Sequence, residues 1–246
     1  GDDDASSAVG VAFSMVAEAA GLFSEDRALN NLGGSGAAVA DVNKDGWPDL
    51  YLTGTLSPSA TIANRLYIND GDGAFIDQTQ QWGLPSGTPA ASSQDAILGI
   101  GATFADYDND GWLDIVVTNG WFFDPGLSDP SVVYWNRLEE SGSFRLVSHS
   151  VGFDDRDYGS SVVSFDMDRD GDMDLVQTTR VRDLRLYENR AREGASLGNY
   201  LVVRPRMSGP NHFAIGAVVR VEVGRLSMMR HVAAGNGYLG QEPAEV

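Results

Sequence analysis

Three short stretches of the chain place oxygen-bearing side chains at alternate positions around a glycine. They span residues 41–49, 106–114 and 166–174. In each stretch, positions 1, 3, 5 and 9 carry Asp or Asn, and position 6 is glycine. A hard divalent cation such as Ca²⁺ takes about six to eight oxygen ligands, which alternate residues of a tight loop can supply. The spacing therefore predicts three metal-binding loops.

The place of each residue in the loop predicts its role. Glycine at position 6 permits the positive φ that reverses the chain. The carbonyl of position 7 then faces the ion, and Asp at position 9 completes the shell through both oxygens. The predicted ligands are Asp41, Asn43, Asp45, Trp47 and Asp49 in the first loop, Asp106, Asp108, Asp110, Trp112 and Asp114 in the second, and Asp166, Asp168, Asp170, Asp172 and Asp174 in the third.

The three loops differ in their charged residues. In the first loop Asn43 replaces a carboxylate and Lys44 adds a positive charge, so we expect this site to be the weakest. In the third loop Asp172 is a fifth Asp. We expect its side chain to point to solvent while it raises the local negative potential.

Two alternatives compete with this interpretation. An EF-hand needs a bidentate Glu at position 12 and flanking helices, but position 12 is Leu52, Val117 and Gln177. Short β-branched runs follow each loop, which is typical of strands. The other alternative is solvated Asp-Gly turns without metal. A ligand pattern that occurs three times in register favours metal binding over such turns.

Each loop lies inside a longer repeat. Small residues precede the loops at two fixed distances: Gly34 and Gly36, Gly99 and Gly101, and Gly159 and Ser161. A marker of the form Leu/Val-Tyr-x-Asn follows each loop. The expected strands are 37–39, 50–53, 66–69 and 75–78 in the first unit, 102–104, 115–118, 133–136 and 144–147 in the second, and 162–165, 175–178 and 186–189 in the third.

This repeat predicts an all-β fold. The first Asp recurs after 65 and then 60 residues, and four short antiparallel strands at about that period are typical of a β-propeller blade. Residues 13–22 match the fourth-strand segment 75–84; we prefer a strand that runs into a helical turn over a short amphipathic helix. Because propellers close with about four to eight blades, we expect a partial propeller whose edges another domain or chain covers.

The pattern changes from about residue 197. Residues 200–204 either complete the third blade or begin a new module, and residues 217–223 and 227–232 alternate like half-buried strands. We therefore expect a flexible acidic leader over 1–12, propeller blades over 13–196 and a small β-module over 197–246. The leader would also suit a chain processed just after a lipid-anchoring cysteine.

Composition excludes several classes of function. The chain has 246 residues, a formal net charge of −18 and no cysteine. The loops hold three, four and five acidic residues, 12 of the 35, and three Ca²⁺ ions would bring the net charge to about −12. A pI near 4.3 argues against nucleic-acid binding. The absence of cysteine excludes disulfides and thiolate metal sites, and no apolar run of about 18 residues predicts a transmembrane helix.

The loop motif D-x-[DN]-x-D-G-x-x-D, the G-x-[GS] lead-in and the L-Y-x-N marker together resemble the FG-GAP/VCBS repeats of integrin-like propellers. Residues 216–221 and 230–241 resemble the ASPIC/UnbV module that follows such repeats in cartilage acidic protein and many bacterial secreted proteins. The resemblance covers roughly residues 13–241. It implies a calcium-stabilised propeller with about three Ca²⁺ per chain, followed by a module that this chain contains in truncated form.

Three functions are compatible with these features. We favour a non-enzymatic scaffold that binds a protein or a glycan and is secreted, periplasmic or on the cell surface, since free Ca²⁺ is scarce in the cytosol. The aromatic run 121–123 is the best expected contact patch, unless it packs as a plug under a blade. A subunit of a larger, membrane-associated assembly is the second possibility.

A metal-dependent lyase or hydrolase is the third possibility. It needs an open coordination position and a nearby acid or base. His149, His212 and His231 lie in different units and in no metal-ligand or nucleophile motif. We therefore expect no enzymatic activity.

Overall fold

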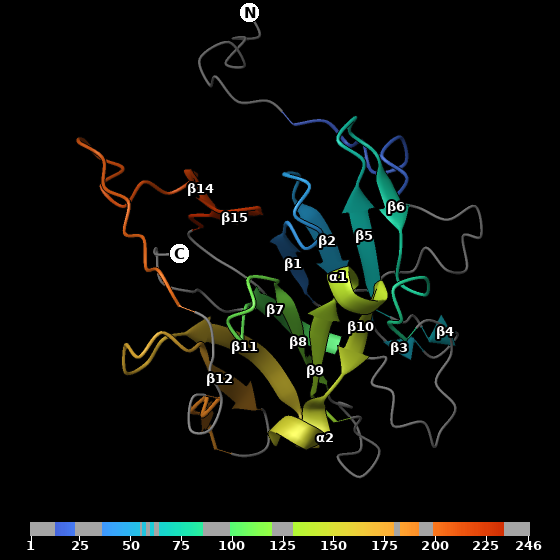
Figure 1. Ribbon diagram of the computed structural model, residues 1–246. Coiled ribbons are helices and arrows are strands. Elements are labelled where there is room, and N and C mark those ends of the chain that lie inside the picture. Colours follow the sequence, from blue (N-terminus) through green and yellow to red (C-terminus); the bar gives the residue numbers. More distant parts are fainter. Residues whose placement is uncertain are drawn as a thin grey trace, which may run out of the picture.

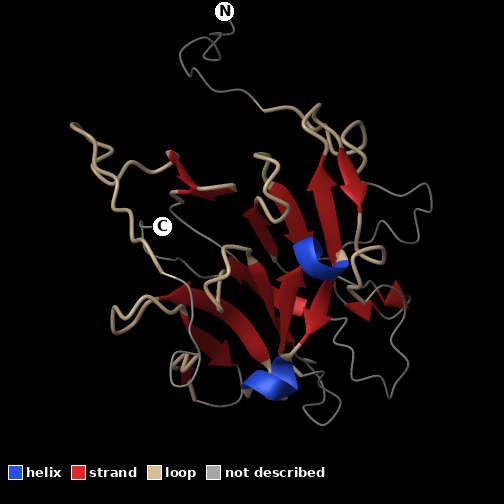
Figure 2. Ribbon diagram, viewed as in Figure 1, coloured by secondary structure: helices blue, strands red, loops and turns tan. Residues whose placement is uncertain are grey.

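The structure is a computed structural model that describes residues 13–22, 36–54, 56–57, 60–61, 64–85, 99–119, 130–179, 183–191 and 199–233. Three antiparallel sheets of four, four and three strands form the main body of this part (Figures 1 and 2). The all-β fold with propeller-type blades is confirmed. None of the described helices is long and apolar enough to cross a membrane.

Each sheet is one of the predicted units, and its strands follow one another in chain order. The strands expected in the three units are all present, with ends shifted by at most three residues. The first blade consists of β1 (Ala37–Ala40), β2 (Asp49–Leu52), β5 (Arg65–Asn69) and β6 (Phe75–Asp77), the second of β7 (Gly99–Ala105), β8 (Asp114–Asn119), β9 (Val132–Arg137) and β10 (Ser143–Leu146), and the third of β11 (Gly159–Phe165), β12 (Asp174–Thr179) and β13 (Arg185–Tyr187).

Shorter elements connect the blades or follow them. A small hairpin between β2 and β5 and two short helices lie in the connections, and a longer hairpin follows the third blade. These elements are β3 (Leu56–Ser57), β4 (Ala60–Thr61), α1 (Leu138–Ser141), α2 (Ser148–Val151), β14 (Val218–Val223) and β15 (Leu226–His231). The two strands expected over 217–223 and 227–232 are thus confirmed.

Residues 200–204 form no strand, so they do not complete the third blade, which was one of the two possibilities expected for them. The segment passes instead over the third metal loop, where the ring of Tyr200 lies directly against Gly171. The third sheet therefore has three strands among the described residues.

The first strands of the blades lie next to one another, with β1 and β11 on either side of β7 (Figure 1). This is the arrangement of inner strands in a propeller. A Cβ on Gly101 would lie 2.8 Å from the carbonyl oxygen of Ser160 in β11, so only glycine fits there. The glycine two residues into β7 is explained by this close approach.

The stretch 13–22 ends in a turn that repeats the turn at the end of the first blade. The carbonyl of Ala20 accepts a hydrogen bond from Phe75 in β6 at 2.8 Å, just as the carbonyl of Trp82 accepts one from Phe144 in β10 at 2.8 Å. The expected helical turn is confirmed, whereas the first four residues of the stretch form no strand. The turn therefore occupies the place of the tail of a preceding blade.

Apolar side chains fill the two interfaces between blades. The interface between the first and second blades buries, among others, Val42, Tyr51, Leu66, Ile115, Val117 and Tyr134. The interface between the second and third blades buries Tyr107, Val116, Val133, Phe153, Val162 and Leu175. The residue at loop position 2 contributes to both interfaces, which couples the metal loops to the packing of the blades.

The Asn of the L-Y-x-N marker also joins neighbouring blades. The buried side chain of Asn136 donates through Nδ2 to the carbonyl of Leu113 at 3.0 Å and to that of Val42, in the first blade, at 2.9 Å. Its Oδ1 accepts the N–H of Leu138 at 3.1 Å. Asn189 repeats the link from the third blade to the carbonyl of Tyr107, at 2.9 Å.

This link predicts a difference between equivalent substitutions. Asn136→Ala should lower the free energy of unfolding by about 2–4 kcal/mol, because two buried carbonyls lose their donor. Asn69→Ala is the matched control and should cost about half as much or less, since among the described residues Asn69 Nδ2 donates only to Pro48 of its own blade, at 3.1 Å. Urea denaturation measures both. Equal losses would show that the bond between blades adds no stability.

Candidate metal sites

The three predicted loops share one backbone conformation. Each joins the first two strands of its blade. Position 4 is left-handed in every loop, and so is the glycine at position 6: the φ angles are 62° for Lys44, 56° for Asn109 and 66° for Arg169, and 93° for Gly46, 89° for Gly111 and 92° for Gly171. Positive φ is uncommon for residues other than glycine. Its recurrence at position 4, which sequence reasoning missed, shows that the loop as a whole imposes this geometry.

The Asp at position 1 holds the loop closed from inside. In the second loop, Asp106 Oδ1 accepts the N–H of Asp110 at 3.1 Å, and Oδ2 accepts that of Gly111 at 2.8 Å. The carboxylate of Asp41 makes the same two contacts in the first loop, at 3.1 and 3.0 Å. In the third loop, Gly171 donates to Asp166 at 3.1 Å.

The buried Asp at position 9 fastens each loop to the third strand of its blade. Asp114 Oδ2 accepts the N–H of Tyr107 at 3.1 Å, and Oδ1 accepts that of Asn136 at 2.8 Å. Asp49 and Asp174 repeat both contacts in their own blades. Each carboxylate oxygen keeps a second lone pair, so this structural role is compatible with the predicted role as a metal ligand.

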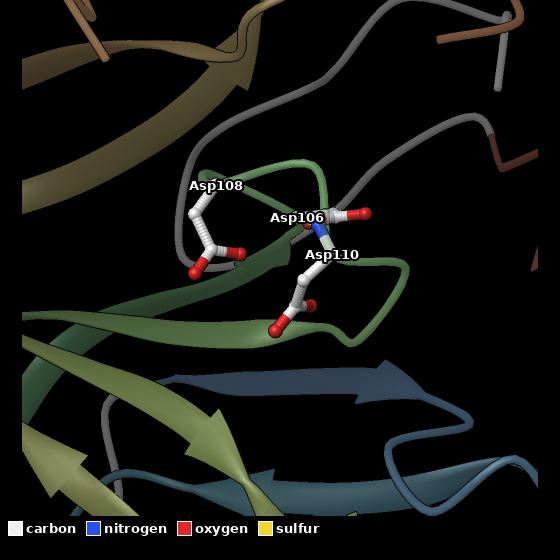
Figure 3. A group of neighbouring side chains, drawn as sticks. All are labelled: Asp106, Asp108 and Asp110. Carbon is white, nitrogen blue, oxygen red and sulfur yellow. Dashed lines mark hydrogen bonds between the residues drawn. The ribbon is translucent and has the colours of Figure 1, made fainter. Parts of the chain in front are cut away.

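The structure brings two groups of the predicted ligands together. Oxygens of Asp106, Asp108 and Asp110 lie within 4.8 Å of one another on the loop between β7 and β8 (Figure 3). Those of Asp166, Asp168 and Asp174 do the same in the third loop. Both groups could hold a metal ion.

Two oxygens in these groups are placed to bind a cation. Asp108 Oδ1 and Asp166 Oδ1 are buried and find no hydrogen-bond donor within the described residues. An uncompensated buried carboxylate oxygen is costly, and a cation at this point would satisfy it. The atoms that would bind the ion are all oxygens, which suits a hard cation. The residues present therefore fit the predicted metal.

The remaining predicted ligands lie outside these two groups. Asp172 is only 1% exposed, and its Oδ1 accepts a hydrogen bond from Asn109 at 2.8 Å. The expectation that it points to solvent is wrong, because the second and third loops pack side by side. In the first loop, Asn43 donates to Asp45 at 2.7 Å, and no carboxylate of that loop belongs to the groups found among the described residues.

The amides at position 7 donate to the Asp at position 5. Trp47 donates to Asp45 at 2.8 Å and Trp112 to Asp110 at 2.8 Å. In the third loop Asp172 donates to Asp170 at 2.9 Å. The carbonyls of these residues remain predicted ligands.

Basic side chains approach the second loop. Arg137 donates to Asp110 Oδ2 at 2.5 Å and to Asp108 Oδ2 at 2.6 Å. Lys44 reaches over from the first loop and places Nζ 3.8 Å from the centre of the Trp112 ring, with no hydrogen-bond acceptor within the described residues. A metal ion in the second loop must therefore share two carboxylates with an arginine. Sequence reasoning missed Arg137, although its position directly after the marker Asn was a usable signal.

The segment after the third blade covers the loops. A Cβ on Gly111 would lie 3.0 Å from Leu226 Cδ2 and 3.3 Å from Met228 Sδ, which places the β14–β15 hairpin on the second loop. A Cβ on Gly46 would lie 3.5 Å from a guanidinium nitrogen of Arg220 in the same hairpin. No sequence pattern connects segments so far apart in the chain, so this contact could not be predicted.

A hollow of about 240 Å³ lies beside the second loop. Its lining combines an aromatic ring with charged and amide groups: Asp110, Trp112, Asn136, Arg137, Glu139 and Glu140. Trp112 Nε1 donates to Glu139 at 3.1 Å, so the indole edge is fixed at the rim.

The comparison with known families agrees with this geometry. Residues 41–117 match the FG-GAP-like repeat family. The match covers the first two metal loops and the strands between them, and it supports an FG-GAP-type repeat fold. Such repeats are typical of extracellular domains and often form scaffolds for binding. Among curated proteins, none matches the sequence.

Some predictions lie beyond these findings. The third loop falls outside the matched segment. The β14–β15 hairpin also falls outside it, so the ASPIC/UnbV resemblance stays a prediction. Its residues 234–241, the leader over 1–12 and the aromatic residues Trp121, Phe122 and Phe123 lie outside the described residues.

Burial shifts the titration of the loop carboxylates. Burial raises the pKa of Asp49 to about 7, although the N–H of Asn69 lowers it. Burial also raises the pKa of Asp106 to about 6, and the charge of Asp110 adds to this shift. The pKa of Asp114 lies well above its usual range, again because of burial. Without a cation, ionising these groups costs folding free energy.

The sign of this effect can be tested. Native carboxylates with raised pKa values bind protons that the unfolded chain has already released above about pH 4. The stability of the metal-free protein should therefore fall between about pH 4 and pH 7, measured as melting temperature in EDTA. Asp49→Asn should flatten this slope, because it removes the group with a pKa of about 7. A melting temperature that rises over this range would contradict the raised pKa values of these carboxylates.

Proposed function

We propose that this chain is a calcium-stabilised, non-enzymatic propeller scaffold that binds a protein or a glycan outside the cytosol. One observation carries the proposal: in each of two loops three aspartates converge, and one of their buried oxygens finds no hydrogen-bond donor within the described residues. In these loops the ion would be held by Asp106, Asp108 and Asp110, and by Asp166, Asp168 and Asp174, with the other predicted ligands completing each shell. The first loop would bind most weakly.

Calcium is preferred over magnesium on chemical grounds. Ca²⁺ accepts a larger and more flexible set of oxygens, whereas Mg²⁺ demands near-octahedral geometry and retains several waters. When bound, the ion supplies positive charge that the crowded carboxylates lack. The bound ion would fix the conformation of the loop. Loop position 2 packs in the interface between blades and loop position 9 is bonded to the third strand, so metal binding contributes to the folding free energy.

The binding role is supported by the surface beside the second loop. The hollow there offers a partner the Trp112 ring, the Arg137 guanidinium and the carboxylate of Glu139 next to the ion. A few placed polar groups beside an aromatic ring are typical of ligand sites. Enzymatic chemistry has less support, because both metal groups consist of aspartates alone and His149 is bonded to Asp154, at 2.7 Å, on the exposed surface.

The first test is removal of the metal. Untreated protein should contain about three Ca²⁺ per chain, and EDTA should lower the melting temperature by roughly 10 °C or more, because each saturated site adds a few kcal/mol. Asp110→Ala should lose about one ion and most of the affinity of the second loop. Asp72→Ala, in an exposed Asp-Gly turn outside the loops, is the control and should keep three. Little calcium and no shift with EDTA would refute the proposal.

Arg137 gives a second test. Arg137→Gln should tighten calcium binding in the second loop by about tenfold, because the ion no longer competes with a guanidinium for Asp108 and Asp110. Arg190→Gln is the matched control, since Arg190 follows the equivalent marker Asn but pairs with Glu188 at 3.1 Å. Isothermal titration calorimetry measures both. Weaker binding in Arg137→Gln would place the ion elsewhere.

A further inference from the structure

The residue at loop position 4 reaches the metal loop of the next blade in both pairs of neighbouring loops. This position is left-handed in every loop, and it lies between the predicted ligands at positions 3 and 5. In the first loop it is Lys44, whose Nζ lies 3.8 Å from the centre of the ring of Trp112, at position 7 of the second loop. In the second loop it is Asn109, which reaches positions 6 and 7 of the third. The same loop position therefore links each site to the following one.

The link between the second and third loops joins an amide to a carboxylate. Asn109 Nδ2 donates to the carbonyl of Gly171 at 3.3 Å and to Oδ1 of Asp172 at 2.8 Å. Gly171 also donates its N–H to Asp166 at 3.1 Å, and the carbonyl of Asp172 is a predicted ligand. The amide of Asn109 therefore fixes the part of the third loop that would face the ion.

The link between the first and second loops carries a positive charge instead. A Cβ on Gly111 would lie 3.5 Å from Lys44 Nζ, so the ammonium group lies against position 6 of the second loop as well as against Trp112. The carboxylates whose charges act most strongly on this ammonium group are Asp110, Glu139 and Asp106. Two of these three are predicted ligands of the second loop. An ion in that loop and the ammonium group of Lys44 thus compete for the same carboxylates.

An ion in one loop can act on the next loop through these links. Calcium held by positions 3 and 5 would fix the backbone on both sides of position 4, and so hold its side chain against the following loop. For Asn109 this order is favourable, because the third loop then loses less conformational freedom when it binds its own ion. For Lys44 the same order is unfavourable, since it holds a positive charge beside the second site.

The charge at each link acts in the same direction as the order. The carboxylate of Asp172 is buried at the contact between the second and third loops, where it attracts an ion in either of them. Lys44 repels an ion in either the first or the second loop. Repulsion between the ions themselves opposes binding in both pairs of loops, and only the link through Asn109 offsets it.

We propose that position 4 couples the metal sites of neighbouring blades, with a sign that its side chain determines: Asn109 makes calcium binding in the second and third loops cooperative, whereas Lys44 makes the first and second loops oppose each other. This inference rests on the proposed calcium binding and deepens it. Both residues are positioning residues, because neither is a predicted ligand. Since coupling is reciprocal, the second and third loops should fill together, and the first should fill last. The chain would then respond to two ranges of calcium concentration.

Each loop contains its own reporter for a test. The N–H of the glycine at position 6 donates to the Asp at position 1 in every loop, with Gly46 at 3.0 Å, Gly111 at 2.8 Å and Gly171 at 3.1 Å. An ion bound to that carboxylate changes the environment of the N–H, so the amide chemical shift of each glycine reports the occupancy of its own loop. A titration of the full chain in chelator-buffered calcium, followed by two-dimensional proton–nitrogen NMR, therefore gives three separate midpoints.

The parent chain and one variant test the cooperative link. In the parent, Gly111 and Gly171 should change together with a Hill coefficient above one, and Gly46 should change at higher calcium. Asn109→Gly should raise the calcium midpoint of Gly171 by about fivefold or more, because the third loop loses its bond from the second. Glycine retains the left-handed φ without strain. Arg169→Gly is the matched control: it introduces the same residue at the same φ one loop later, and it should keep the two changes cooperative.

Variants of Lys44 test the opposing link. Lys44→Asn should lower the midpoint of Gly111 by about fivefold, because it removes the charge beside the second site, and by reciprocity the midpoint of Gly46 should fall as well. Lys44→Arg is the control, since it keeps the charge and Arg169 shows that position 4 accommodates an arginine, at a φ of 66°. Its midpoints should stay near those of the parent. Unshifted amide signals from the blade strands would show that the variants fold.

Failure of this inference and failure of the proposed function give different results. Glycine amides that do not respond to calcium in the parent chain would refute the proposed function, and the coupling with it. Amides that respond normally, with a Gly171 midpoint unchanged by Asn109→Gly or a Gly111 midpoint not lowered by Lys44→Asn, would overturn the coupling while calcium binding stands.

Discussion

The buried aspartate at loop position 9 is the constraint on which each blade depends. Its two oxygens accept backbone N–H groups from loop position 2 and from the marker Asn, so one carboxylate joins the loop to the third strand. In the second and third blades the same Asn also donates to the preceding blade. A buried carboxylate with these partners remains costly while it carries an uncompensated charge. The fold therefore concentrates negative charge at the point where its blades are joined.

A cation bound in the loops would resolve this conflict between connectivity and charge. Without one, burial raises the pKa of Asp49, Asp106 and Asp114. Among the basic groups near the loops, Arg137 pairs with Asp108 and Asp110 of the second loop. The similar φ angles at positions 4 and 6 in three loops show that the same turn is formed three times. The loops, the interfaces between blades and the covering hairpin consequently depend on the same few carboxylates. We infer that the metal acts through the architecture, and that a partner meets a surface ordered by it.

Much of the fold could be predicted because it repeats. The loop spacing, the small residues before each loop and the marker occur in all three units, and every repetition reduces the chance of a coincidence. The ranges of the strands and their grouping into blades followed from this. What failed was particular: Asp172 is buried, because loops from different blades touch, and residues 200–204 cross a loop, whereas a strand was one of the two possibilities expected for them.

The candidate sites were predictable in type and less so in detail. The spacing of the aspartates pointed to the three loops. It could not show that both oxygens of Asp114 accept backbone N–H groups, or that Arg137 pairs with two of the predicted ligands. Those contacts arise from strands that are distant in the chain. The role of the marker Asn was missed for the same reason: its acceptor lies in another blade.

The most direct test of the account is anomalous diffraction from crystals grown with calcium. The account predicts peaks in the second and third loops at about 2.3–2.6 Å from Asp108 Oδ1 and Asp166 Oδ1, two buried oxygens that find no hydrogen-bond donor within the described residues. Well-ordered loops without such peaks, with Arg137 still paired to Asp108 and Asp110, would contradict it.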